Sequence, residues 1–472
     1  MVTTVCWFQS DLRMQDHSAL TEAAVAGHHL VCLFIWDPEA EGDWALGPAQ
    51  RAWLGESLRA LAASLEARGQ KLIVRSGDTA QVVAEIVGRV QATQVFAQRR
   101  VEPWAIDLHN RVKKRLKSGG SELVLTQGDL LYDPKEIVSR KGAEIKVFTP
   151  FWNACRKYGS PPRPTRIPIL PPPARLHSEE IPLCLSEDHD LGNRFRGLWS
   201  PGEKGAQTRW RWFLNGPIND YEEGRDRPDA DATSKISAWL HFGEISPRQL
   251  WHDVRDMAHL TKGAETYLRE LGWREFSHHM LFHFPDTPEK PLRPEFARFP
   301  WCHNKKWLRA WQEGVTGYPL VDAGMRQLYQ TGWMHNRVRM NTASFLVKHL
   351  RLPWLWGARW FWERLVDADL ANNTMGWQWS AGCGADAAPY FRIFNPVLQG
   401  EKFDPNGAYV REWIPELSGL PLKWIHRPWE APEDVRRQAG VVLGQNYPMP
   451  IVEHCKARQQ ALDAFASLRE CR

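Results

Sequence analysis

The chain begins with TTVCWFQSDLR, residues Thr3–Arg13, in which an apolar run gives way abruptly to polar and charged residues. Such a run is typical of a buried strand, and the polar residues after it are typical of a strand-to-helix turn. We therefore expect Thr3–Phe8 to be the first strand of a sheet. Four more short apolar runs in the first 132 residues predict its partners: Leu30–Asp37, Lys71–Arg75, Gln94–Gln98 and Glu122–Thr126.

Helical patterns separate these runs. Apolar residues recur at helical spacing in Gln50–Arg68, Ala80–Val90 and Pro103–Lys117. Strands that alternate with helices predict a parallel sheet of the doubly wound type. Residues 1–132 are therefore predicted to form an α/β domain.

The pattern changes after residue 132. Prolines cluster in SPPRPTRIPILPPP, residues 160–173, so residues 133–201 are predicted to be an interdomain linker, part of it stiff and extended. From residue 202 to 472 no strand pattern is found, and a helical domain is predicted. Its expected helices are Lys204–Leu214, Pro247–Met257, Gly263–Phe284, Lys305–Gln312, Pro319–Thr331, Met334–His349 and Trp356–Val366.

Length and composition exclude several classes of protein. The 472 residues exceed one average domain, and no window approaches the ~20 apolar residues that a membrane span requires. The N-terminus lacks the pattern of a secretory signal, and the 8 cysteines form no CxxC pair, so we expect a cytoplasmic protein without disulfides or zinc. The net charge of +5 permits a nucleic-acid partner without requiring one. No long heptad is visible, and we expect a monomer.

Tryptophan is unusually frequent, with 25 residues in the chain. Each buried indole N–H needs a hydrogen-bond partner, so burial alone is a poor reason for so many. Composition leaves two interpretations open: a helical core built from large aromatics, or chemistry that uses indoles for stacking or electron transfer.

Two short motifs carry weak signals. Asp11, Arg13 and Asp16 follow the first strand, where α/β folds place ligand sites, but helix caps and a structural ion pair are the favoured interpretation. The segment Gly382–Ala387 matches GxGxxA, yet no predicted strand precedes it and no helix follows it. A dinucleotide fingerprint is therefore disfavoured there.

Three histidines share one predicted helix: His278, His279 and His283. The i,i+4 pair His279 and His283 has the spacing of metal ligands. No nearby carboxylate or cysteine completes a site in the sequence, so structural roles are favoured and no metal is expected.

Two segments, Thr331–Leu350 and Asp367–Trp379, concentrate charges and amides among apolar residues. Such groups are costly to bury unless they are paired, and Arg339 with Asp367 is a natural pair. The segments form either a structural polar network or a pocket for a polar, planar ligand.

A third arrangement lies on the predicted helix Gly263–Phe284, where Glu270, Trp273 and Arg274 share one face. This set suits recognition of an aromatic base, because the carboxylate accepts from ring N–H groups and the indole stacks. It equally suits an exposed salt bridge beside a core tryptophan.

Over nearly its whole length the chain resembles the photolyase/cryptochrome family. The resemblance is carried, in family order, by WFQSDLR, KVFTPFWNA, ATSKISAWLHFGEISPRQ, WREF, TGYPLVDAGMRQL, GWMHNRVRM and WQWSAGCGADAAPYFRIFNP. Within the family it is most similar to class I cyclobutane-dimer photolyases of the bacterial type. The resemblance implies FAD in the helical domain and repair of cyclobutane pyrimidine dimers in DNA, by an electron from photoexcited reduced FAD. Such an enzyme is a carbon–carbon lyase.

The resemblance also assigns roles to residues. Asn373 corresponds to the amide beside flavin N5, and Glu270 to the carboxylate that bonds the lesion. The implied FAD-binding positions are Tyr221, Thr233, Ser234, Lys235, Ile236, Ser237, Tyr267, Arg274, Arg339, Asp367, Asp369 and Asn373. The implied dimer-contacting positions are Arg225, Glu270, Trp273, Asn336, Arg337, Met340 and Trp379. The implied electron relay runs from Trp377, nearest the flavin, through Trp354 to Trp301.

The chain departs from the family pattern at several positions. Ser277 stands where a tyrosine is frequent, Lys235 where an arginine is frequent, and Thr374-Met375 where Asn-Gly is common. For a second, antenna chromophore, Trp44 replaces the histidine of folate-binding relatives, whereas Glu102 matches a folate-contacting carboxylate. The antenna is methenyltetrahydrofolate, a deazaflavin, another flavin, or absent.

Three rival functions follow from the same resemblance or from charge alone. A cryptochrome-like photoreceptor is disfavoured because Glu270, Met340 and Trp379 are present and the chain ends soon after the family core. Repair of the (6-4) photoproduct needs a histidine pair at the lesion, where this chain has Asn336 and Met340. A non-catalytic flavoprotein that binds nucleic acid is the third.

Overall fold

The structure is a computed structural model that describes residues 2–182, 195, 197–386 and 391–470. Two compact units make up the chain. The first unit comprises Met1–Gly216, Ser234–Pro285 and Val366–Ala371, and the second comprises Pro217–Thr233, Asp286–Leu365 and Asn372–Arg472. The expected fold class, an α/β domain followed by a helical FAD-binding domain, is confirmed.

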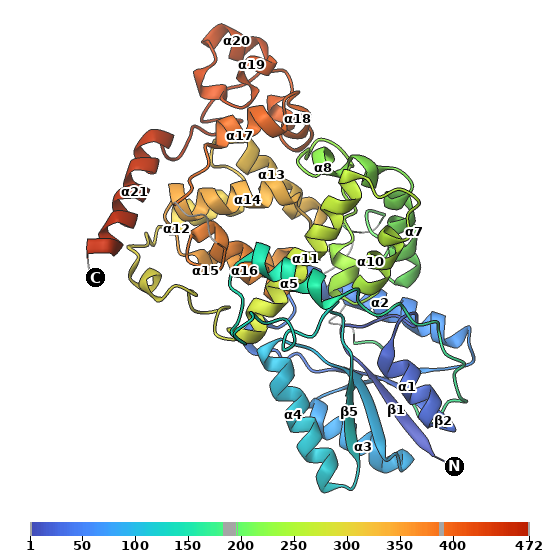
Figure 1. Cartoon of the computed structure of the whole chain (residues 1–472). Coiled ribbons are helices and arrows are strands. Elements are labelled where there is room, and N and C mark those ends of the chain that lie inside the picture. The colour runs from blue at the N-terminus through green and yellow to red at the C-terminus, as the bar shows by residue number, and fades with distance from the viewer. Residues whose placement is uncertain (1, 183–194, 196, 387–390, 471–472) are drawn as a thin grey trace. The chain divides into compact units, whose positions relative to one another are not determined.

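One parallel sheet organises the first unit (Figure 1). Its strands are paired in the order β3-β2-β1-β4-β5, so the order reverses at β1. At such a reversal the connections leave in opposite directions, and a crevice opens beyond the carboxyl ends of the strands. The five predicted strands are all present, each within one residue: β1 Thr3–Phe8, β2 His29–Trp36, β3 Leu72–Ser76, β4 Gln94–Gln98 and β5 Glu122–Thr126.

The helices between the strands also match the prediction, with one omission. Pro48–Glu66 (α2), Thr79–Val90 (α3) and Pro103–Ser118 (α4) were expected, whereas Ser18–Ala26 (α1) was not. The sequence of α1, SALTEAAVA, has only one large apolar residue in its first turns and no clear periodicity. Its start is instead fixed by His17, whose ring nitrogen accepts a hydrogen bond from the backbone N–H of Leu20.

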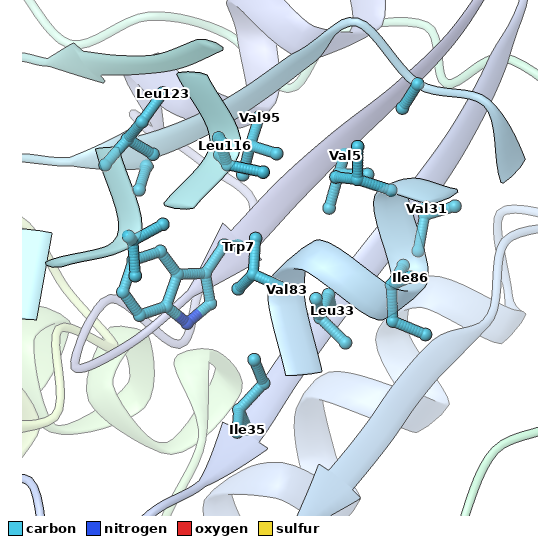
Figure 2. Packing of buried hydrophobic residues seen from close by; sticks show 14 of the residues in the cluster. Val5, Trp7, Val31, Leu33, Ile35, Val83, Ile86, Val95, Leu116 and Leu123 are labelled. Carbon is cyan, nitrogen blue, oxygen red and sulfur yellow. The ribbon is translucent and has the colours of Figure 1, made fainter. Parts of the chain in front are cut away.

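The core of the sheet explains why the strand signals were strong. Side chains from β1, β2 and β4 pack against α3 and α4, and Figure 2 shows Trp7 among them, close to Val83 and Leu33. These residues are almost fully buried. Strands covered on both faces read as continuous apolar runs, which is how they appear in the sequence.

The rest of the first unit contains a proline-rich segment without regular structure and several helices. Residues 160–172, in the proline-rich segment, form neither helix nor strand. The Asp16 N–H donates to the carbonyl oxygen of Thr165, and the Thr165 N–H donates to the Asp16 carboxylate. The predicted linker also contains one helix that was not expected, Phe148–Tyr158 (α5). The remaining helices of this unit are α7 Glu203–Leu214, α9 Ser237–His241, α10 Pro247–Arg255 and α11 Lys262–His283.

The second unit is all-helical in its described residues. The predicted helices Lys305–Gln312 (α12) and Pro319–Thr331 (α13) are found with the same bounds. The predicted helix Met334–His349 is α14, Asn336–Ser344, continued by a π-helical segment, Phe345–His349. The others are α8 Tyr221–Gly224, α15 Trp354–Arg364, α16 Leu370–Ala381, α17 Pro396–Phe403, α18 Ala408–Trp413, α19 Leu422–Ile425, α20 Glu433–Gln438 and α21 His454–Glu470. Among the described residues, no helix combines the length and apolar character needed to cross a bilayer.

Candidate functional site

The polar residues that follow β1 are held in buried ion pairs. Arg13 donates to both carboxylate oxygens of Asp129, at 2.9 and 2.6 Å. Asp16 accepts from Arg248 at 3.0 Å, and both partners are almost completely buried. This supports the structural interpretation of Arg13 and Asp16. Asp11 has a second role, because it also lines a hollow.

That hollow is partly open to solvent and lies where β1 and β4 end in the first unit. It is the place where a sheet of this strand order is expected to bind a ligand. Its wall is formed by Gln9, Ser10, Asp11, Gln98, Arg99, Arg100, Val101, Glu102, Asp129, Leu130, Leu240, His241, Arg274, His278 and Asp369.

One side of the hollow carries an ion pair and an amide. Arg100 donates to Glu102 at 2.6 Å and lies 4.7 Å above the ring of Trp104. Burial alone would raise the pKa of Glu102, but the charge and hydrogen bonds of Arg100, together with the charge of His278, outweigh it and the pKa is lowered. Gln98 is 2% exposed, and its side-chain amide has no hydrogen-bond partner among the described residues. A buried amide of this kind is available to a polar ligand.

Asp369 and His278 also line the hollow. Nε2 of His278 lies 3.2 Å from a carboxylate oxygen of Asp369, and its Nδ1 lies 2.9 Å from the carbonyl oxygen of Arg274. Burial alone would raise the pKa of Asp369, but the charge and hydrogen bond of His278, together with the charges of Arg274 and His241, lower it well below its usual range. Asp367, two residues earlier, accepts a hydrogen bond from the hydroxyl of Ser237 at 2.6 Å.

The run Thr233–Ser237 forms the tight turn that leads into α9. Lys235 has a φ of 53°, in the left-handed region that a side chain disfavours, and the surrounding structure must hold it there. Part of that support comes from Arg209, which donates to the carbonyl oxygen of Ser234 at 2.8 Å. Ile236 is buried.

The predicted face of α11 is present. Glu270, Trp273 and Arg274 are all half-buried, and the next helical turn is buried. Trp273 stacks on Phe148 with ring centroids 3.7 Å apart. Arg274 donates to the carbonyl oxygen of Asp129 at 2.9 Å. The sequence therefore identified a real shared face, in which the indole already has an aromatic neighbour.

Tyr267, one turn earlier on α11, is buried with its ring 5.3 Å from that of Trp210. Ser277, at the position where relatives carry tyrosine, donates back to the carbonyl oxygen of Trp273 at 2.9 Å. Trp44 is buried in the 3-10 turn Gly42–Trp44.

Several implied DNA-contacting residues come together in the second unit. Arg337 donates twice to one carboxylate oxygen of Asp226, at 3.0 and 2.5 Å. The sulfur of Met340 lies 3.8 Å from Arg337 and 4.0 Å from the amide of Asn336. Arg225 follows α8 and lies 5.9 Å from the ring of Tyr221, which is an implied FAD-binding residue. One acidic residue thus fixes the guanidinium in a group of side chains suited to phosphates and bases.

Helix α16 carries Asn373, Trp377 and Trp379 in the second unit. Asn373 donates to the carbonyl oxygen of Ala358 on α15 at 3.0 Å. Trp379 is half-buried. Gly376 is exposed, and a Cβ added there would meet nothing within 4 Å. The Gly376 position on α16, one turn after Asn373, therefore faces open space.

The three implied relay tryptophans form a series from the interior to the surface. Trp377 is 2% exposed and packs against Gly357 on α15, and Trp354 begins the same helix and is also buried. Trp301 is half-exposed, and the N–H of the next residue, Cys302, donates to the carbonyl oxygen of Arg351 at 2.7 Å. The three indoles therefore lie on neighbouring segments of one unit.

Three further features were singled out in the sequence: Arg339, the pair His279 and His283, and the segment Gly382–Ala387. Arg339 donates to the carbonyl oxygen of Met334 at 2.7 Å, and its expected pair with Asp367 stays a prediction. The rings of His279 and His283 are tilted by 60° with their centroids 4.4 Å apart, and in the described part of the chain no three metal-ligating side chains meet. The segment Gly382–Ala387 follows a helix rather than a strand, and Ala387 itself lies outside the described residues.

Two family models match the chain. Residues 4–171 match the model described as DNA photolyase, and residues 267–467 match the FAD-binding domain of DNA photolyase. The chain belongs to the photolyase/cryptochrome family. The resemblance recognised in the sequence is thereby confirmed, and so is FAD as the cofactor of the family's helical domain.

Full-length photolyase relatives agree with this assignment. A deoxyribodipyrimidine photo-lyase of Agrobacterium fabrum is 43% identical, with 99% of this chain and 98% of the relative aligned. A crystal structure titled a bacterial class III photolyase from Agrobacterium tumefaciens superposes with a TM-score of 0.94 at 42% identity, over 100% of this chain and 98% of that one. Cryptochrome-1 of Arabidopsis thaliana is 39% identical, over 98% of this chain and 70% of its own length. The similarity to a structure titled class III does not support the class I subdivision expected from the sequence.

Sequence reasoning missed several residues around the hollow. The Gln50 amide donates to the carbonyl oxygen of Ala368 at 2.8 Å and contacts the ring of His241 at 3.0 Å. Gln98 and Arg100 were missed as well. Their only available signal was position, since they lie at and just after the carboxyl end of β4, beside the strand-order reversal.

Proposed function

We propose that this photolyase-family chain repairs cyclobutane pyrimidine dimers in DNA, using light absorbed by reduced FAD, as a deoxyribodipyrimidine photo-lyase. One observation supports this proposal most directly. The chain is related over its full length to photo-lyases, and it also has three neighbouring side chains of the kind expected to contact the lesion: Asn336, Arg337 and Met340. Asp226 holds Arg337 of this group in place. A fold of this family alone would not require that set.

The donor chemistry fits FAD. Asp367 and Asp369 on the segment 366–371 offer carboxyl oxygens that suit the hydroxyl and N–H groups of a flavin nucleotide. The open space at Gly376 on α16, one turn after Asn373, can receive a planar group. We assign FAD binding to Tyr221, Thr233, Ser234, Lys235, Ile236, Ser237, Tyr267, Arg274, Arg339, Asp367, Asp369 and Asn373.

When bound, reduced FAD supplies one photoexcited electron to the dimer and recovers it after the two carbon–carbon bonds have opened. The chain supplies positioning and electrostatics for this chemistry. Glu270 accepts hydrogen bonds from base edges or, when protonated, donates to a carbonyl that gains negative charge. Trp273 and Trp379 offer apolar surfaces on which a flipped dinucleotide stacks.

Arg225 and Arg337 hold the DNA backbone in this scheme. Guanidinium groups bind phosphates bidentately, and affinity from such contacts falls steeply as salt rises. Asp226 prevents Arg337 from moving freely, since its carboxylate accepts two of the guanidinium N–H groups. The remaining N–H donors of Arg337 are therefore held in one orientation before DNA binds.

The tryptophan series Trp377, Trp354 and Trp301 restores reduced flavin after accidental oxidation. The interior-to-surface order of exposure suits this task, because the last indole must meet an external reductant. The relay is accessory to repair, which itself involves no net redox change.

We further propose that the hollow beyond β1 and β4 holds the antenna chromophore. In its wall, Glu102, Gln98 and Arg100 offer a pigment an acceptor, an amide and a cation. Because Trp44 stands where folate-binding relatives have a histidine, that histidine contact is absent. The identity of the pigment as a folate, a deazaflavin or a flavin is not decided by this difference. The absorbance of the pigment released from purified protein distinguishes them.

The experiment that tests repair uses an oligonucleotide with one cyclobutane thymine dimer. With flavin fully reduced, the wild-type chain should restore the undamaged oligonucleotide under blue light and not in darkness. Glu270→Ala should lower the yield of splitting, whereas Glu265→Ala, an exposed position one turn earlier on α11, should not. A flavin-loaded, reduced chain that binds the lesion without repairing it would instead be a photoreceptor or a binding protein.

A further inference from the structure

His278 has an unusual environment on α11 in the first unit. Its ring is buried, and both ring nitrogens face an acceptor: the Arg274 carbonyl oxygen at 2.9 Å and the Asp369 carboxylate at 3.2 Å. A neutral imidazole has one N–H and can donate to only one of them. The doubly protonated imidazolium has two N–H groups and satisfies both. The contact geometry therefore favours a charged His278.

The charged groups around His278 point to the same conclusion. Three carboxylates interact with it electrostatically: Asp369, Glu102 and Glu275. One guanidinium, that of Arg274, opposes them. Burial alone would lower the pKa of His278, but the charge and hydrogen bond of Asp369, together with the hydrogen bond to the Arg274 carbonyl, outweigh burial and the Arg274 charge, and the pKa is raised. Negative charge thus predominates around the ring.

His278 also connects two parts of the wall of the hollow. The same wall contains Glu102, the implied antenna contact, and Asp369, the implied FAD contact. The charge of His278 lowers the pKa of both carboxyl groups. Among the residues that lower the pKa of Glu102, only Arg100 has a larger effect than His278. Loss of this one cation would therefore weaken the ionised form of an acceptor at each chromophore position.

We propose that His278 is a positioning residue for the chromophores: its imidazolium holds Asp369 ionised and oriented as an acceptor for FAD, and favours ionised Glu102 in the hollow. This inference rests on the proposed assignment of Asp369 to FAD. His278 itself contacts no reacting atom. It acts through the carboxylate, as second-sphere groups do in cofactor sites.

The affinity for FAD should depend on the protonation of His278, and therefore on pH. Since the pKa of His278 is raised above the ordinary value of 6.5, its proton is kept to a higher pH than in an ordinary histidine and is lost as the pH rises through the raised value. Asp369 then loses the cation and the N–H donor that stabilise its ionised form, so affinity for FAD falls on the alkaline side. A neutral histidine in a purely structural role would produce no such step.

The test measures FAD binding by the apoprotein, from the quenching of flavin fluorescence, at about pH 6 and about pH 9. We expect wild type to bind roughly tenfold more tightly at the lower pH, on the scale of one charge-assisted hydrogen bond. His278→Gln should bind weakly at both values. His278→Lys should restore tight binding at both, because lysine stays charged to about pH 10. His279→Gln is the matched control, since burial lowers the pKa of His279 to about 4 and leaves it neutral throughout.

Equal affinity of wild type and His278→Gln at both pH values would overturn the inference and leave the proposed function intact. A wild-type chain that takes up no FAD would overturn both. A second measurement does not depend on the folding of any variant: nitrogen NMR of histidine-labelled wild type should show one ring with both nitrogens protonated at neutral pH, absent from His278→Gln. A neutral His278 ring in that spectrum would also overturn the inference.

Discussion

Gly357 supports the buried indole of Trp377, and replacing it with alanine should disturb both stability and photoreduction. A Cβ at this position would lie 2.1 Å from Cη2, 2.4 Å from Cζ3 and 2.7 Å from Cζ2 of Trp377. Ordinary contact begins near 3.4 Å, so the ring must retreat by about 1.3 Å. It has little room, because Phe361 and Trp311 lie 5.0 and 6.1 Å away, centroid to centroid. Overpacking of this kind costs about 1–3 kcal/mol.

Three assays together isolate this effect. Urea unfolding should show Gly357→Ala less stable by that amount, and blue-light reduction of oxidised flavin should slow because Trp377 is displaced. Repair by chemically reduced enzyme should persist, since the relay does not take part in it. Gly88→Ala is the matched control: Gly88 is exposed on α3 with nothing within 4 Å, so the same change should stabilise by about 0.5–1 kcal/mol. Unchanged stability and photoreduction in Gly357→Ala would refute the reasoning.

Three further predictions concern the relay, the DNA and a buried acid. Trp301→Phe should abolish photoreduction but not repair by chemically reduced enzyme, whereas Trp307→Phe should alter neither; a transient-absorption measurement of flavin reduction checks both. Arg337→Ala should weaken binding of damaged DNA and flatten the plot of log affinity against log salt by about 0.9; an unchanged salt slope would remove Arg337 from the phosphate contacts. Burial raises the pKa of Glu244 to about 8 from an ordinary 4.5, so the folded chain binds a proton that the unfolded chain releases. Stability should therefore fall as the pH rises from about 4.5 to about 8, and urea titrations should show a smaller fall in Glu244→Gln; an equal fall in both proteins would show that another group is responsible.

The sheet could be predicted from sequence because its strands are buried on both faces. Residues such as Val31 and Leu33 form an uninterrupted apolar run, and the strand bounds followed within one residue. Helix α1 escaped prediction because short alanine-rich segments carry almost no periodicity, and its capping residue, His17, is not a usual N-cap. Helix α5 escaped because it lies in a stretch dominated by turn residues and prolines.

The site was predicted less evenly than the fold. The shared face of Glu270, Trp273 and Arg274 followed from helical spacing alone, which is a local property. The pairs Asp226–Arg337 and His278–Asp369 join residues about a hundred positions apart, and no local pattern connects such partners. Resemblance to a family supplied the functional residues, but it gave no reason to notice His278.

The polar residues after β1 show how position and pairing combine. The sequence favoured a structural role for Asp11, Arg13 and Asp16, and the buried bonds of Arg13 and Asp16 agree. Asp11 nevertheless lines the hollow as well. Sequence inspection could not assign both roles to one turn, since the second depends on the strand order.

The most direct test of the central claim is the absorbance spectrum of the purified chain before and after incubation with FAD. A protein that carries, or takes up, one FAD per chain and bleaches its flavin bands on photoreduction would agree with the account. A colourless chain that remains colourless after incubation with the cofactor would contradict it.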